Sequence, residues 1–158
     1  MEDMKAYRAA ILRFDDQGQA VHESDGLLVI GPDAGGQAVV RAVGAYQALA
    51  EQFPGVPVTH WPGRLIAPGF VDMHIHYPQT DIIGSPAQGL LPWLERYTFP
   101  AEARFADPAH AQEVARFFLD ELARNGVTTA LAFATSHPAS VDALFGEAQK
   151  RGMRSPKP

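Results

Sequence analysis

The chain has 158 residues, 46% of them hydrophobic, which is enough for a folded domain with its own core. The 13 Lys and Arg and 18 Asp and Glu give a net charge of −5, and the scattered basic residues argue against a nucleic-acid surface. The absence of cysteine excludes disulfides, thiolate zinc sites and the zinc deaminases with His/Cys/Cys ligands. No apolar run has membrane-spanning length, and we expect a cytoplasmic protein without membrane or nucleic-acid partners.

Short apolar segments dominate the first 60 residues. Gly-rich turns separate three predicted strands, at residues 6–14, 27–30 and 37–43. One face of a short helix is marked by Tyr46, Leu49, Ala50 and Phe53. Pro54-Gly55 ends this helix, and residues 56–60 are expected to return to the sheet. We therefore expect a small antiparallel sheet in this part of the chain.

Residues 65–76 hold the most informative pattern of the sequence. The stretch begins apolar, breaks at Pro68-Gly69 and then alternates, so that Asp72, His74 and His76 lie on one side of an extended strand. Two imidazoles on one face can occupy two coordination positions of a single transition-metal ion. Asp72, one pleat behind His74, could stabilise the packing or the orientation of the histidine pair.

The strand is expected to stop after His76, because Pro78 lacks the N–H that a central strand needs. Residues 77–86 are then predicted to form a long loop, which is a common place for binding groups. A short helix is predicted over residues 90–97, with Phe99-Pro100 as its end.

The last third of the sequence alternates between helix and strand. Asp107-Pro108 is a typical helix start, and Asn125-Gly126 is a typical helix end. The buried stripe of this helix is predicted to comprise Val114, Phe117, Phe118 and Leu122, and we expect both phenylalanines in the core. Residues 127–134 resemble a strand that a parallel sheet buries on both faces. A final helix is marked by Val141, Leu144, Phe145 and Ala148. This order indicates the opening of an α/β array.

The spacing of His74 and His76 does not establish a metal site by itself, because two histidines bonded to nearby carbonyls at a strand end have the same spacing. The surrounding residues are more specific. Residues 68–76 resemble the opening signature of the amidohydrolase superfamily, in which this motif ends the first barrel strand after a small β-sandwich. The chain also resembles the guanine deaminase branch of that superfamily, in residues 74–81, 91–102 and 125–130. The most branch-specific part is residues 97–100.

The resemblance implies a zinc site whose first two ligands are His74 and His76. It also implies that His76, Tyr77, Pro78 and Gln79 bind the substrate, which is guanine in the family, and that Gln79 hydrogen-bonds the purine. A side-chain amide carries both donor and acceptor, which suits the mixed edge of guanine. The implied reaction is zinc-dependent hydrolytic deamination of guanine to xanthine and ammonia, carried out in the family by full-length proteins that are expected to be homodimers.

The resemblance predicts an α/β fold class, as the N-terminal part of an amidohydrolase. Residues 1–66 are expected to form a β-sandwich segment, residues 67–154 the first βα units of an incomplete TIM-like barrel, and residues 155–158 an unrelated tail. A closed barrel of this type takes about 250 residues. The family's remaining ligands, two histidines and an aspartate, and its glutamate acid/base come from later strands. We therefore expect a truncated member of the branch, from a shortened or frame-shifted gene, with an incomplete zinc site, no catalytic residue of its own and no activity alone.

Two other functions remain open from the sequence: an amidohydrolase that acts on a triazine or pyrimidine ring, and a non-catalytic binding module. Trp93 either walls the substrate pocket or anchors the short helix in the core. His137 is expected in a loop near the site, and Asp81 is expected to be a solvated loop carboxylate. Surface or packing positions are expected for His22, His60 and His110.

Overall fold

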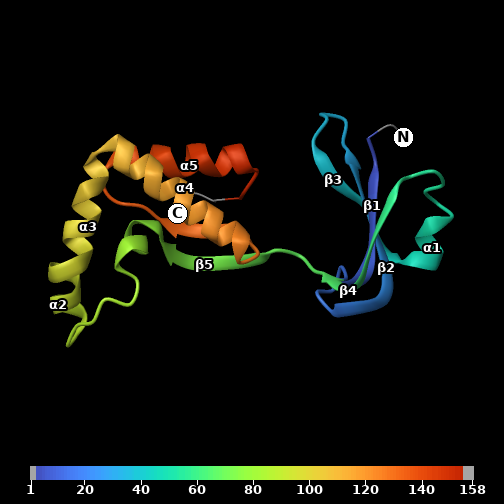
Figure 1. The fold of residues 1–158 in the computed structure, drawn as a ribbon, viewed down its shortest axis with the longest axis horizontal. Helices are drawn as coiled ribbons and strands as arrows, with labels where there is room; N and C mark the ends of the chain where they lie inside the picture. The colour runs from blue at the N-terminus through green and yellow to red at the C-terminus, as the bar shows by residue number, and fades with distance from the viewer. Residues whose placement is uncertain (1–2, 155–158) are drawn as a thin grey trace. The chain divides into compact units, whose positions relative to one another are not determined.

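The structure is a computed structural model that describes residues 3–154, and the predicted tail at 155–158 lies outside them. The chain divides after Pro68 into two compact units, and each is described by itself (Figure 1). The predicted boundary after residue 66 lies two residues before this division. None of the helices within residues 3–154 has the length and hydrophobicity needed to cross a membrane.

The first unit is a four-stranded sheet in the order β3-β2-β1-β4. Its elements are β1 (Lys5–Phe14), β2 (Ala20–Pro32), β3 (Ala38–Ala45), α1 (Tyr46–Ala50) and β4 (Val58–Ile66). The first three strands pair antiparallel as predicted, but β4 pairs parallel to β1. The prediction of a purely antiparallel sheet is wrong at β4, because α1 and the residues after it form a crossover that brings β4 back in the direction of β1.

Strand β4 also extends beyond the predicted return at residues 56–60. Pro62 and Gly63 lie inside it, at the edge of the sheet. In the pairing with β1, Arg8 lies opposite His60, and the next pair is Ala10 opposite Leu65. The register therefore shifts between these two pairs. This irregularity accommodates the proline, whose missing N–H costs no ladder bond on the open side of an edge strand.

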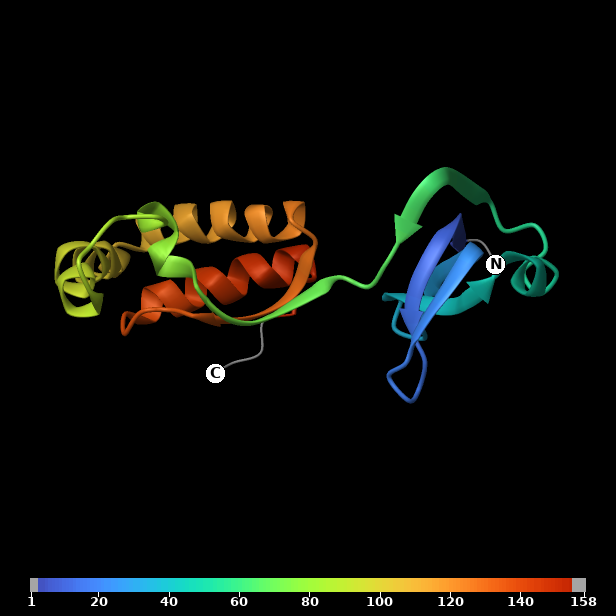
Figure 2. The same cartoon turned by 90° about the horizontal axis from the view of Figure 1, so that it is seen from below.

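The second unit is built on two parallel strands, β5 (Phe70–His76) and β6 (Val127–Phe133), joined through α4 (Pro108–Arg124). Helix α5 (Pro138–Arg151) follows β6. The helices α4 and α5 lie side by side in both views and share one apolar core with β6 (Figures 1 and 2). This β-α-β-α order is the α/β arrangement that the sequence predicted, and the fold class is confirmed.

Helix α4 begins and ends where the sequence predicts. The Asp107 carboxylate accepts a hydrogen bond from the Ala109 amide at 2.9 Å, and Gly126 takes a φ of 80° after the C-cap. Phe118 is buried, but Phe117 is 54% exposed, so the prediction that both belong to the core is wrong. Successive helical residues differ by about 100° in direction, and only Phe118 shares the direction of Leu122, four residues later.

Between β5 and α4 the chain forms a series of short helices instead of an extended loop. These are η1 (Tyr77–Ile82), α2 (Leu90–Trp93), η2 (Leu94–Thr98), α3 (Phe99–Ala103) and η3 (Arg104–Ala106). The predicted helix end at Phe99-Pro100 is wrong, because the helix continues through η2, a π-helical turn, into α3. The Phe99 amide bonds to the Leu94 carbonyl five residues back, and this wider turn accommodates the proline ring.

A nearly buried carboxylate joins α5 to α4. Glu147, 3% exposed, accepts hydrogen bonds from Gln112 of α4 and from Lys150 and Arg151 of α5. Arg151 also donates to Asp120 of α4 at 2.9 Å. The hydrogen bonds from Lys150 and Arg151 lower the pKa of Glu147 to about 2.

We expect Glu147→Gln to remove a pH-dependent part of the second unit's stability. The folded-state pKa lies below the ordinary value of 4.5, so the stabilisation is complete above 4.5 and is lost as the pH falls towards about 2. The urea midpoint of the variant should therefore be lower than that of the parent at pH 7, and the difference should shrink at pH 2.5. Glu113→Gln, at an exposed position of α4, is the charge-matched control. A midpoint difference that is equal at both pH values would contradict this assignment.

Candidate metal and substrate site

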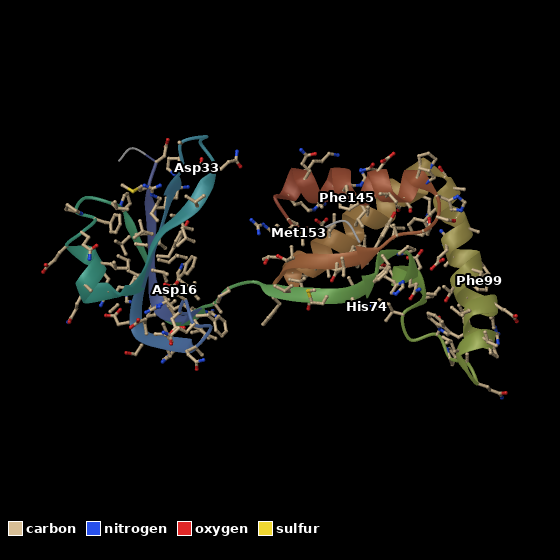
Figure 3. The ribbon with its side chains drawn as sticks, turned by 180° about the vertical axis from the view of Figure 1, so that it is seen from behind. Asp16, Asp33, His74, Phe99, Phe145 and Met153 are labelled. Carbon is tan, nitrogen blue, oxygen red and sulfur yellow. The ribbon has the colours of Figure 1, made fainter. Side chains whose placement is uncertain are left out.

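The two histidines of β5 project from the same face of the strand, as its alternation predicts. Their Nε2 atoms lie 3.2 Å apart, and their ring centroids are separated by 5.1 Å. Figure 3 shows His74 on β5, near the end at which the strand passes into η1. The pair therefore presents two ring nitrogens to one point in space.

Neighbouring residues hold this arrangement. Phe133 of β6 lies opposite His76 in the parallel register, and its ring centroid is 4.8 Å from each imidazole. The Asp72 carboxylate accepts a hydrogen bond from the backbone amide of His74 at 3.0 Å, so it contacts the backbone and not the imidazole. Sequence reasoning missed Phe133. Its position at the end of the adjacent parallel strand was the available signal.

The distance between the two Nε2 atoms fits two ligands of one zinc ion. Nitrogen ligands at about 2.0–2.1 Å from a tetrahedral zinc lie about 3.3 Å from each other. Within residues 3–154, no group of three or more His, Cys, Asp and Glu side chains is arranged to hold a metal. The donor set of the described chain thus fits two positions of such a site.

The histidine pair lies on the wall of a cleft of about 760 Å³ in the second unit. Gln79 of η1, Trp93 of α2 and Phe117 of α4 line the same cleft. Of the two roles open for Trp93, the pocket wall is therefore favoured. The sequence did not predict that Phe117 lines a cleft. The available signal was its position next to Phe118, which belongs to the buried stripe of α4. The cleft combines two imidazoles, two side-chain amides, one carboxylate and three aromatic rings, from His74, His76, Gln79, Asn125, Glu121, Trp93, Phe117 and Phe118.

Tyr77 and Pro78, two of the predicted substrate-binding residues, are buried and are not among the residues that line this cleft. The Tyr77 hydroxyl donates a 2.6 Å hydrogen bond to the Ser140 carbonyl, and its ring meets the Phe105 ring edge-on. Burial raises the pKa of Tyr77 to about 12, so the phenol stays neutral as a donor. Tyr77 secures η1 on the apolar core of the unit, and the buried Pro78 follows it in the same helix.

Two polar contacts join η1 to the helices that follow it. Gln79 Nε2 donates to Glu102 Oε1 of α3 at 3.4 Å. Arg104 of η3 pairs with Asp81 at 3.2 Å, so the predicted solvated carboxylate has an ionic partner. The predicted loop is therefore an ordered segment that presents Gln79 to the cleft.

None of the other four histidines lines the cleft of the pair. His137 occupies the N-cap position of α5 and lines a small separate cleft with Glu102 and Thr135. His110 packs against Phe105, with ring centroids 4.8 Å apart. In the first unit, the exposed His22 and His60 line another cleft.

Comparison with known proteins adds independent information. The sequence model of the amidohydrolase family matches residues 65–155. The guanine deaminase of Escherichia coli is 47% identical over 131 residues, which are 82% of this chain and 29% of that protein. A crystal structure of guanine deaminase from Bradyrhizobium japonicum matches with a TM-score of 0.88 at 37% identity, over 97% of this chain and 34% of that one. A guanine deaminase from C. acetobutylicum with guanine bound in its active site matches at 26% identity with a TM-score of 0.78, over 96% and 35% of the two chains.

The chain spans about a third of the length of the relatives that it matches. Its fold is accordingly a part of the amidohydrolase fold. The matched region takes up more than half of the sequence and contains both histidines of β5 and Gln79. On these grounds the chain belongs to the amidohydrolase family.

Proposed function

We propose that residues 1–154 are the part of a guanine deaminase that supplies two zinc ligands and one wall of the purine pocket. The observation that carries this proposal is the pair of Nε2 atoms 3.2 Å apart beside Gln79, in a chain 47% identical to the E. coli guanine deaminase. The complete reaction adds one water to guanine and releases xanthine and ammonia.

In this proposal His74 and His76 hold zinc through their Nε2 atoms, while His76 also borders the substrate. Zinc, when bound, supplies a Lewis acid that makes water nucleophilic near neutral pH. Gln79 hydrogen-bonds the purine edge, and the rings of Trp93 and Phe117 restrict water in the cleft. Tyr77 and Pro78 support Gln79 from the core.

A fusion protein tests this proposal. Residues 1–154 are joined to the remaining part of the E. coli guanine deaminase, and product formation is measured with guanine, cytosine and melamine. We expect xanthine from guanine and no product from the other two rings. Turnover of cytosine or melamine in preference to guanine would assign the chain to another branch of the family. A folded, zinc-loaded fusion that releases no ammonia from any of the three would favour the non-catalytic binding module.

A further inference from the structure

We propose that Glu102 is a positioning residue that fixes the orientation of the Gln79 side-chain amide and thereby selects which edge of a ligand the cleft accepts. This inference rests on the proposed function and deepens it. It concerns a residue outside the histidine cleft, since Glu102 lines the neighbouring small cleft with Phe99 and Thr135.

The side chains of Gln79 and Glu102 contact each other and line different clefts. Gln79 lines the histidine cleft, and its Nε2 atom faces Glu102 Oε1 at 3.4 Å in a partly buried contact. Glu102 itself is not among the residues that line the histidine cleft. It is placed to act on the amide without touching a ligand bound in the cleft.

The chemistry of a carboxylate determines which end of the amide faces it. An ionised carboxylate only accepts hydrogen bonds, whereas an amide has a donor end and an acceptor end. Only the NH₂ end of Gln79 can face Glu102 favourably, because the flipped amide would set two oxygens against each other. The Oε1 atom of Gln79 is then held ready as an acceptor. A ligand with a ring N–H or an exocyclic amino group at that position is favoured over one that presents only acceptors.

Other contacts hold the two segments together without a ligand. Arg104 and Asp81 form an ion pair between η3 and η1, and Tyr77 packs against Phe105 next to it. The ion pair is about half exposed and contributes little, whereas the buried packing of Tyr77 on Phe105 fixes the backbones that carry Gln79 and Glu102 before a ligand binds. Asp81 is also a useful control position, since its partner is Arg104 and not the amide.

The first test observes the amide directly in the 158-residue chain. The side-chain NH₂ signals of Gln79 are assigned in a ¹H–¹⁵N spectrum by their loss in Gln79→Ala. We expect Glu102→Gln to shift these signals and to speed their exchange with water, because a glutamine can accept from or donate to either end of the amide. Asp81→Asn should leave them in place. Signals that are unchanged by Glu102→Gln would overturn the proposal.

The second test measures guanine turnover in the fusion with the rest of the E. coli enzyme. Glu102→Gln is expected to raise KM about tenfold, the usual cost of a charge-assisted hydrogen bond, with a much smaller change in kcat. Glu102→Asp keeps the acceptor-only character and should recover part of the loss, and Asp81→Asn should change KM less than about twofold. Equal effects of Glu102→Gln and Asp81→Asn would reduce Glu102 to a structural contact and overturn the proposal. If the parent fusion shows no guanine turnover, the proposed function fails, and the spectra of the 158-residue chain still decide the role of Glu102.

Discussion

Residues 1–158 alone are expected to convert no guanine to xanthine, even with zinc in excess. A catalytic zinc site normally has three protein ligands and one open position, whereas the described residues bring together two imidazoles. Two ligands bind the ion weakly, and the carboxylate that lines the cleft, Glu121, is paired with Arg124. The fusion that contains the later part of the E. coli enzyme should be active under the same conditions.

The measurement is xanthine formation by absorbance, at equal molar amounts of the isolated chain and the fusion. Zinc binding is followed in parallel by competition with a chelating dye, and the isolated chain should lose zinc to the dye far more readily. Turnover by the isolated chain at a rate close to that of the fusion would show that the site is complete without further residues.

The physical state of the isolated chain needs its own control. Strand β5 exposes apolar side chains, with Phe70 67%, Val71 57% and Met73 68% exposed. An exposed apolar strand in a two-stranded sheet favours association with other chains. Light scattering and circular dichroism therefore accompany the assay, so that a folded, inactive chain is distinguished from an aggregated one.

Local sequence signals predicted much of the second unit. The Asp107 cap, the helix end at Gly126 and the shared face of His74 and His76 depend on residues close in the chain, and the structure contains all three. The errors arose where a local rule has a structural alternative. A proline inside a helix usually ends it, but a π-helical turn accommodates Pro100 here. The direction of β4 depends on its crossover connection, which the composition of the strand does not encode.

The candidate site was predictable only in its sequence-local part. His74 and His76 share a face because side chains alternate along a strand, so their pairing follows from two positions in the sequence. The contact of Phe133 with both rings depends on the register of β5 and β6, which are about 50 residues apart. The contact of Gln79 with Glu102 likewise depends on how η1 and α3 meet. Contacts of this kind require the fold, not the motif.

The largest effect of single substitutions is expected at the histidine pair. In the active fusion, His74→Ala or His76→Ala should each remove bound zinc and guanine turnover together. Losing a hydrogen-bond partner of a metal ligand already costs about 10–100-fold in affinity or activity, and we expect the loss of a ligand itself to cost more than about 100-fold. Zinc per protein molecule and kcat/KM are measured on the same preparations.

The control for these two variants is His137→Ala, because His137 is a histidine of the same unit that lies outside the cleft of the pair. It should retain zinc and turnover close to those of the parent fusion. Two nitrogens 3.2 Å apart are also compatible with a hydrogen bond between neutral imidazoles at a strand end, and the substitutions separate the two interpretations. If the pair is only structural, both alanine variants keep their zinc and lose stability. If a variant loses zinc but unfolds at the same temperature as the parent, the loss of zinc is caused by the missing imidazole.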